Sequence, residues 1–312
     1  MADLGTTRFG KYLLLEKLAV GGMAQLYKAK ITGVQGFEKL IAIKTILPHL
    51  ASEKELITSF IDEAKLAALL HHQNIVQIYD FGPMEDSYFI AMEYLFGKDL
   101  RHIFSKSQEK GMPFSNELAL YVISRICSGL DYAHNLKDYQ GKSLNIIHRD
   151  ISPQNIFVTY EGDVKIVDFG IAKAASQSTI TQFGMIKGKI SYMSPEQASG
   201  QSIDHRSDLF STGILLYEMV THKRMFTGAD TMQILAKVSK AEFEPPEVAL
   251  SGLPPKIYQI INRNLTKDRD QRCQSCGEML ADIEECIIAL SLRPSARGLS
   301  QYMKELFKEE IA

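Results

Sequence analysis

Three oxygen-bearing side chains that could carry chemistry, Asp150, Asn155 and Asp168, lie within a short stretch near the middle of the sequence. Two runs rich in β-branched residues, 155–159 and 163–167, flank the sequence Tyr-Glu-Gly-Asp, which predicts a β-hairpin. A turn centred on the Glu-Gly pair would place Asn155 directly opposite Asp168, with their Cβ atoms about 5 Å apart. An amide oxygen and a carboxylate at that separation suit Mg²⁺, which prefers oxygen ligands. Asp150 precedes the hairpin and could act as a base, so the three residues predict metal-assisted phosphoryl transfer.

The order of these residues resembles the catalytic motifs of protein kinases. His148-Arg149-Asp150 followed by Asn155 resembles the catalytic loop, and Asp168-Phe169-Gly170 resembles the metal-binding motif. The resemblance implies that Asp150 accepts or orients the proton of the substrate hydroxyl, and that Asn155 and Asp168 hold Mg²⁺. Either triplet alone could occur by chance, but both triplets in the right order with Asn155 argue against coincidence.

An earlier lysine and glutamate fit the same resemblance. Residues 40–44 alternate as a strand, so Ala42 and Lys44 share one face. In a kinase, Ala42 would cover adenine and Lys44 would bind the α- and β-phosphates. A helix is expected over 52–70, and Glu63 borders its buried face, where a carboxylate needs a cationic partner. Lys44 is the candidate partner, and this ion pair belongs to the active state of the family. The alternatives are a solvated strand lysine and a solvated glutamate.

The loop between strands expected at 9–18 and 25–31 resembles the kinase glycine-rich loop, whose backbone N–H groups close over the ATP phosphates. The match is imperfect, because Ala19 and Ala24 replace the first and third glycines, while Gly21 fits the middle one and Gly22 adds flexibility. With the other matching positions, the expected ATP contacts are Leu18, Ala19, Val20, Gly21, Gly22, Met23, Ala24, Leu26, Ala42, Lys44, Glu63, Met92, Glu93, Leu95 and Phe157.

The sequence Met-Glu-Tyr-Leu after the last expected strands, 75–81 and 88–92, resembles the kinase hinge. Met92 would then be the gatekeeper, and the Glu93 carbonyl and Leu95 N–H would bond the adenine edge. Gly97 follows as a linker. We therefore expect three parts: an N-lobe over 1–95, a C-lobe over 96–291 and a helical tail over 292–312.

The region after Gly97 predicts a mainly helical lobe, and its motifs suit a peptide substrate. An activation segment over 171–194 leads into Ser-Pro-Glu, whose Glu196 is expected to bridge to Arg272. Asp208 heads a very apolar helix, and the family uses this aspartate to bond the backbone of the catalytic loop. The expected helices are 99–106, 116–137, 206–221, 230–241, 254–265 and 275–291.

Two positions depart from the serine/threonine kinase pattern. Ser152 stands where the family usually has a lysine, and Lys189 stands where it usually has a threonine. We hypothesise that the groups have exchanged places: Lys189 reaches Asp150 and the γ-phosphate, and Ser152 supplies the hydroxyl contact. Alternatively, Lys189 points to solvent or to a substrate. In the family the arginine at the position of Arg149 can pair with an activation-segment phosphate. The available hydroxyls are those of Ser176, Ser178, Thr179 and Thr181, and Thr181 best matches the position that is modified in bacterial relatives.

Composition excludes several classes of protein. A content of 45% hydrophobic and 23% charged residues excludes a disordered chain, and a net charge of −2 gives no reason to expect nucleic-acid binding. The four cysteines are sparse, which favours a reducing cytoplasm, and the Cys273-x-x-Cys276 pair has no second half that would complete a zinc site. No signal peptide or membrane-spanning run is expected.

A last amphipathic helix with Leu299, Met303, Leu306 and Phe307 could pack on the C-lobe or dock a partner.

The sequence therefore predicts a two-lobed α+β fold that resembles bacterial eukaryotic-type (Hanks-type) serine/threonine protein kinases. The resemblance implies transfer of the γ-phosphoryl group of Mg-ATP to serine or threonine hydroxyls of proteins. Two alternatives stay open: a pseudokinase that acts as a signalling scaffold, and a small-molecule kinase of related fold.

Overall fold

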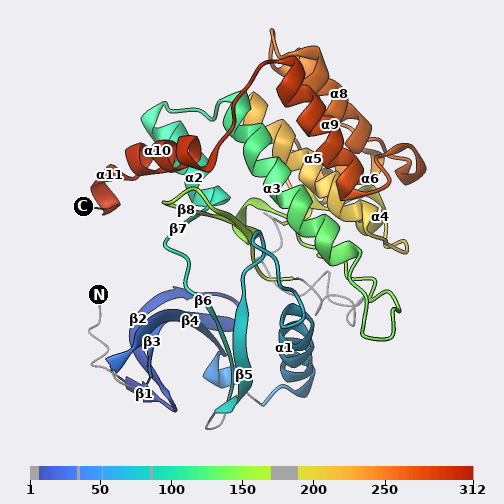
Figure 1. Cartoon of the computed structure of the whole chain (residues 1–312). Coiled ribbons are helices and arrows are strands. Elements are labelled where there is room, and N and C mark those ends of the chain that lie inside the picture. Colours follow the sequence, from blue (N-terminus) through green and yellow to red (C-terminus); the bar gives the residue numbers. More distant parts are fainter. Residues whose placement is uncertain (1–6, 34–35, 51, 85–86, 170–188, 312) are drawn as a thin grey trace. The chain divides into compact units, whose positions relative to one another are not determined.

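The computed structural model of the chain describes residues 7–33, 36–50, 52–84, 87–169 and 189–311, and it is drawn in Figure 1. The chain divides between Phe96 and Gly97 into two compact units. We call them the N-terminal unit and the C-terminal unit, and describe each by itself.

The N-terminal unit is built on an antiparallel six-stranded sheet in the order β1-β2-β3-β4-β6-β5. Helix α1 (Lys54–Ala67) lies beside β5, as Figure 1 shows. A 3₁₀ turn, Pro48–Leu50, leads from the sheet towards this helix. The strands are β1 (Thr7–Phe9), β2 (Tyr12–Val20), β3 (Ala24–Thr32), β4 (Glu38–Ile46), β5 (Ile78–Met84) and β6 (Ser87–Glu93).

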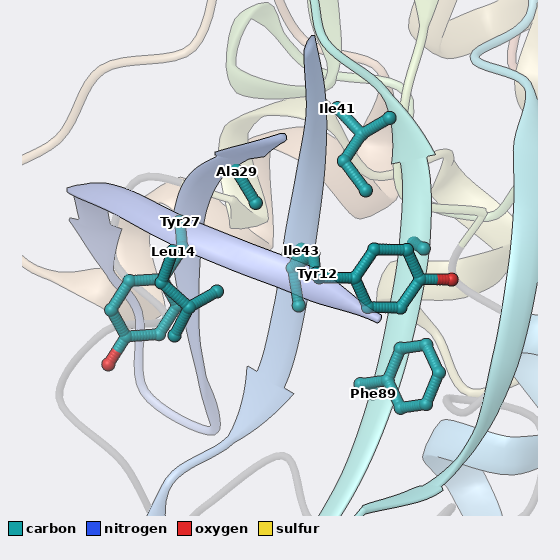
Figure 2. Close-up of a cluster of buried hydrophobic side chains, with 8 residues drawn as sticks. Tyr12, Leu14, Tyr27, Ala29, Ile41, Ile43 and Phe89 are labelled. Atoms are coloured by element: carbon teal, nitrogen blue, oxygen red, sulfur yellow. The ribbon is translucent and has the colours of Figure 1, made fainter. Parts of the chain in front are cut away.

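One face of this sheet carries an apolar cluster, shown in Figure 2. Its members alternate along each strand and meet across strands, as in the pairs Ala29–Ile41 and Ile43–Ala91. Because side chains alternate between faces, the intervening Ala42 and Lys44 of β4 belong to the opposite face. The cluster consists of Tyr12, Leu14, Tyr27, Ala29, Ile41, Ile43, Phe89 and Ala91.

The C-terminal unit is mainly helical and is centred on α5 (Arg206–Thr221), in which every residue from Ser207 onward is buried. A helix buried all round belongs in the centre of a domain, and α3 and α8 pack against it. The other helices are α2 (Leu100–Lys110), α3 (Asn116–His134), α4 (Pro195–Ala198), α6 (Thr231–Lys240), α7 (Pro246–Ala249), α8 (Pro255–Asn264), α9 (Cys276–Ala289), α10 (Ala296–Leu306) and α11 (Lys308–Ile311).

Serine and aspartate caps start many of these helices. In α3, for example, the Ser115 hydroxyl accepts a hydrogen bond from Leu118 N–H, one of the donors that a helix N-terminus leaves unpaired. The capping residues of α2, α3, α4, α6, α9 and α10 are Asp99, Ser115, Ser194, Asp230, Ser275 and Ser295.

A small sheet in the C-terminal unit, ordered β7-β8-β9, corrects the predicted hairpin register. Strand β8 (Ile156–Thr159) pairs with β9 (Val164–Ile166) so that Ile156 faces Ile166, and Asn155 is bonded to Val167. The prediction that Asn155 lies directly opposite Asp168 is therefore wrong by one residue. Thr159 and Asp163 close a three-residue loop, whereas a two-residue turn was expected.

Gly162 explains the longer loop. Its φ of +90° is a conformation that favours glycine, and a Cβ atom there would collide with the backbone carbonyl of Ala296 at the start of α10. Strand β7 (Gly97–Asp99) shows the same kind of close approach, because a Cβ on Gly97 would meet the backbone of Val158.

Other element boundaries differ modestly from expectation. The strand expected at 9–18 is two strands, since Gly10, with a φ of +59°, turns the chain between β1 and β2. The glycine-rich connection is shorter than expected, because Ala19 pairs with Leu26 and Val20 pairs with Gln25. The loop before Pro255 contains the short helix α7. The α+β class and the helical character of the C-terminal unit are confirmed.

The C-terminal tail packs on its own unit. Leu299, Met303 and Leu306 of α10 are fully buried, and the Ser300 hydroxyl donates to the Tyr160 carbonyl at 2.7 Å. Because its apolar side is covered, the helix presents no apolar face to a docking partner, and the packing alternative is confirmed. Among the described residues, no helix combines the length and apolar character needed to cross a membrane.

Candidate active site

The loop that carries Asp150 is held in a strained conformation by Asp208. The Asp208 carboxylate accepts hydrogen bonds from the backbone N–H groups of His148 and Arg149, each at 2.8 Å. Arg149 has a φ of +67°, a left-handed conformation that costs energy in a residue with a side chain. Gln197 Nε2 donates to the Arg149 carbonyl at 2.9 Å, so both backbone polar groups of Arg149 are fixed. The expectation that Asp208 bonds the backbone of the catalytic loop is confirmed.

Asp208 is ionised although it is fully buried. Burial alone would raise its pKa, but the hydrogen bonds from the His134 side chain and from the His148 backbone N–H hold the pKa of Asp208 below its ordinary value. His134 Nε2 lies 2.8 Å from Asp208 Oδ2. The sequence analysis did not find His134, because it lies in α3, far from Asp208 in sequence, and its position carries no local motif.

His148 is a neutral spacer within the loop. Burial lowers its pKa, its Nε2 lies 3.1 Å from the Val167 carbonyl, and its Nδ1 accepts from Asp150 N–H. These partners fix the tautomer with the proton on Nε2. The buried Phe169 ring lies 4.6 Å from the imidazole, so His148 joins the catalytic loop to the stretch that carries Asp168.

Asp150 is held by two donors on the same oxygen. Asn155 Nδ2 lies 2.9 Å from Asp150 Oδ2, and Lys189 Nζ lies 2.6 Å from that oxygen. The Asp150 side chain is only 11% exposed. The expected contact between Lys189 and Asp150 is therefore present. The contact expected of Ser152 is not: its hydroxyl is buried and has no hydrogen-bond partner among the described residues.

Asn155 and Asp168 carry the oxygen atoms that suit a divalent cation. Asn155 Nδ2 also donates to the Asp150 carbonyl at 2.7 Å, so its amide nitrogen is committed to Asp150 and the amide oxygen is left for a metal. Asp168 adopts a φ of +54° just beyond β9, where the chain leaves the strand. An amide oxygen and a carboxylate are hard ligands of the kind that Mg²⁺ prefers, so the residues fit the ion.

In the N-terminal unit, Lys44 and Glu63 form the expected ion pair. Lys44 Nζ lies 2.9 Å from Glu63 Oε1, and both side chains are largely buried, at 18% and 16% exposure. Glu63 borders the buried face of α1, which is formed by Phe60, Ala64 and Ala67. A pair shielded from solvent in this way places a fixed cation on the face of β4 that also carries Ala42.

The remaining residues expected to contact ATP lie on both units. In the connection from β2 to β3, Gly21 N–H donates to the Ala24 carbonyl at 2.8 Å, which makes a tight turn with the side chains of Val20 and Met23 exposed. Met92 is buried, and Glu93 N–H donates to the Gln77 carbonyl at 2.8 Å. The other expected contacts lie in β2 (Leu18, Ala19), the turn (Gly22), β3 (Leu26), the stretch after β6 (Leu95) and β8 (Phe157). Gly170 and Thr181 lie outside the described residues.

The stretch after Lys189 is anchored to the core of the C-terminal unit. Arg272 and Glu196 form the expected buried bridge, with Nη1–Oε1 and Nη2–Oε2 distances of 2.8 and 2.9 Å. The Tyr192 hydroxyl donates to buried Glu218 at 2.7 Å, an interaction that the sequence analysis missed. Ser194 and Gln197 form a capping box at the start of α4. The spacing of such boxes, a serine followed three residues later by a glutamine, could have identified Gln197.

Comparison with known proteins identifies the family. Residues 12–282 match the model of the protein kinase domain. The chain belongs to the protein kinase family. It is 40% identical over 303 residues to the tyrosine-protein kinase MasK of Myxococcus xanthus, a match that covers 97% of this chain and 47% of MasK. It is 34% identical over 281 residues to the serine/threonine-protein kinase PrkC of Bacillus subtilis, covering 90% of this chain and 41% of PrkC.

Further comparisons agree with this assignment. The chain is 33% identical over 279 residues to the serine/threonine-protein kinase PknB of Mycobacterium tuberculosis, covering 88% of this chain and 42% of PknB. It spans less than half the length of these three relatives. The kinase domain of M. tuberculosis PknI matches with a TM-score of 0.66 and 23% identity over 91% of this chain and 99% of that domain, which shows the fold. The chain is thus a catalytic domain of the bacterial Hanks type.

Proposed function

We propose that this protein transfers the γ-phosphoryl group of ATP to serine and threonine hydroxyls of proteins. The observation that carries the proposal is the fixed carboxylate of Asp150. Asn155 and Lys189 both bond it, and Asp208 and Gln197 hold the loop around it. A largely buried, oriented carboxylate of this kind is suited to accept a hydroxyl proton.

In the proposed reaction the substrate hydroxyl gives its proton to Asp150 while its oxygen bonds to the γ-phosphorus. The bond from that phosphorus to the bridging oxygen breaks, and ADP leaves with the electron pair. Lys44, oriented by Glu63, would bind the α- and β-phosphates. Asn155 and Asp168 would hold Mg²⁺, which when bound offsets negative charge on the phosphate oxygens.

The set of residues argues against the two alternatives. A pseudokinase scaffold usually lacks at least one of the phosphate-binding, metal-binding or base residues, whereas Lys44, Asp150, Asn155 and Asp168 are all present. A small-molecule kinase would not need the anchored stretch that ends in the Glu196–Arg272 bridge, which suits a protein substrate.

A second candidate acceptor is the tyrosine hydroxyl. MasK, which is 40% identical to this chain over 97% of this chain's length, is named a tyrosine-protein kinase. The tyrosine hydroxyl lies further from the backbone and is more acidic than a serine or threonine hydroxyl, but both kinds of acceptor would use the same base. Identifying the phosphorylated amino acid separates them. Phosphoamino-acid analysis of the labelled protein gives phosphoserine and phosphothreonine if the main proposal holds, and phosphotyrosine if the second one does.

We further propose that the reaction takes place in the cytoplasm and is regulated by phosphorylation of the activation segment. The four cysteines are free and buried, which suits a reducing compartment that supplies ATP. A phosphate on Thr181 would add about two negative charges. Arg149, beside the base, is the cation proposed to pair with it.

The proposed function is tested by autophosphorylation with Mg²⁺ and ATP. Asp150→Asn removes the base and Lys44→Met removes the phosphate-binding cation, and each should lower the rate by about 100-fold or more. Lys256→Met, an exposed lysine at the start of α8, is the matched control and should retain the wild-type rate. Wild-type activity in Asp150→Asn would refute the assignment.

A further inference from the structure

We propose that Lys189 is a positioning residue for the catalytic base, and that it supplies from the turn before α4 the cation that the catalytic loop lacks at Ser152. The inference rests on the proposed kinase function and deepens it. It concerns Lys189, Asp150 and Ser152, which all belong to the C-terminal unit, so the geometry that supports it lies within one compact body.

The first observation is the contact itself. Lys189 Nζ lies 2.6 Å from Asp150 Oδ2, a short charge-assisted hydrogen bond. The same oxygen accepts from Asn155 Nδ2 at 2.9 Å. Two donors on one carboxylate oxygen hold that oxygen in place, so Lys189 acts on the position of Asp150 Oδ2 as well as on its charge.

The second observation is that the backbone of Lys189 is anchored. Lys189 caps the 3₁₀ turn Ile190–Tyr192, and its carbonyl accepts from Tyr192 N–H at 3.1 Å. Tyr192 in turn is bound to the central helix, because its hydroxyl donates to Glu218 and its carbonyl accepts from Ser211 at 2.7 Å. A surface lysine on a loose loop would lose most of its ion-pair energy to side-chain and loop entropy. Here the donor starts from a fixed point.

The third observation concerns the serine two residues after the base. Ser152 is 2% exposed, and its hydroxyl has no partner among the described residues. A buried hydroxyl without a partner is unfavourable by about 1–3 kcal/mol, so no hydrogen bond explains the serine. Only half of the exchange that the sequence suggested is therefore present. Lys189 supplies the cation beside Asp150. The Ser152 hydroxyl does not make the contact that the family's threonine makes.

These observations make positions 152 and 189 alternative places for the one lysine that bonds Asp150. Residues two apart have Cα atoms at most about 7 Å from each other, and a lysine stem spans about 6 Å, so a lysine at position 152 could reach Asp150. The two positions should therefore be coupled in catalysis although they lie on different segments. Independent surface residues show no such coupling.

The single-variant test measures kcat and KM on a peptide substrate with Mg²⁺ and ATP. Lys189→Thr should lower kcat by about 10- to 100-fold, as the loss of a positioned cation does, with KM for ATP changed less than about threefold. Lys189→Arg keeps the charge and should retain clearly more activity than Lys189→Met. Lys256→Thr is the control for loss of a lysine elsewhere, and circular dichroism checks that each variant is folded.

The decisive test is the double variant Ser152→Lys with Lys189→Thr, which should recover most of the lost kcat. Near-normal kcat in Lys189→Thr would overturn the proposal, as would a folded double variant without recovery. If the double variant fails to fold, the comparison of Arg with Met at position 189 decides, and equal losses refute the role of the cation. Loss of activity in all variants and in wild-type protein would instead refute the kinase function itself.

Discussion

The buried bridge between Arg272 and Glu196 allows a sharp prediction about stability. Arg272 is 0% and Glu196 5% exposed, and the two groups are joined by paired hydrogen bonds of 2.8 and 2.9 Å. The Arg272→Met variant keeps much of the side-chain volume but leaves Glu196 as a buried charge, with the Ser207 hydroxyl as its remaining side-chain donor. Breaking a buried pair in this way costs about 3–5 kcal/mol.

Several contacts place the expected loss at the upper end of this range. Besides the carboxylate, the guanidinium donates to three backbone carbonyls, which the variant also leaves without this donor: those of Thr266, Arg206 and Lys267. We therefore expect the free energy of unfolding to fall by about 5 kcal/mol. The control is Lys304→Met, which breaks a half-exposed ion pair with Glu161 and should cost less than about 1 kcal/mol.

The pH dependence provides a second measurement. Burial alone would raise the pKa of Glu196, but the hydrogen bonds from Arg272 and Ser207 hold it below the ordinary value of 4.5. A group whose pKa is lowered on folding stabilises the protein above its unfolded pKa, and this contribution is lost as the pH falls through the folded value. In Arg272→Met, burial without the arginine should raise the pKa of Glu196. The difference in free energy of unfolding between wild type and variant should therefore shrink as the pH falls towards about 4.

The assay is urea denaturation followed by far-ultraviolet circular dichroism, because the chain contains no tryptophan. The double variant Arg272→Met, Glu196→Leu removes both charges, and we expect it to be more stable than Arg272→Met alone. A loss below about 1 kcal/mol in Arg272→Met would refute the reasoning. So would a double variant whose loss equals the sum of the two single losses.

Three further predictions concern the catalytic hairpin, its scaffold and its regulation. Gly162→Ala should destabilise the protein by at least about 2 kcal/mol in urea denaturation, because both its φ and the nearby carbonyl of α10 exclude a Cβ. Gly141→Ala, which has a positive φ but open space, should cost only about 1 kcal/mol. Asp208→Asn should lower kcat by at least about tenfold in steady-state assays, with KM for ATP nearly unchanged, since it weakens the support of the base. Thr181→Ala should reduce activity and remove a phosphate seen by mass spectrometry, whereas full activity would exclude Thr181 and its pairing with Arg149.

Local sequence patterns determined much of the site. The alternation of β4 predicted that Ala42 and Lys44 share a face. The helical stripe of α1 placed Glu63 at a buried edge, where it needed a cation, and this pointed to the ion pair between Lys44 and Glu63. The resemblance to the kinase catalytic loop implied that Asp150 and Asn155 act together. The inferences about β4 and α1 succeeded because side-chain periodicity within one strand or helix depends on backbone geometry that neighbouring residues share.

Only the tertiary structure decided the contacts that depend on distant packing. The hairpin register was missed by one residue, because the loop at Gly162 is shaped by its contact with α10, which lies far along the chain. His134, in another helix, could not be assigned to Asp208 from local pattern. The sequence suggested that Lys189 and Ser152 exchange the roles of the family's threonine and lysine. In the structure Lys189 bonds Asp150, but the Ser152 hydroxyl has no hydrogen-bond partner among the described residues. Which polar groups meet, and which are buried without a partner, is set when separate elements pack together, and no local periodicity encodes that choice.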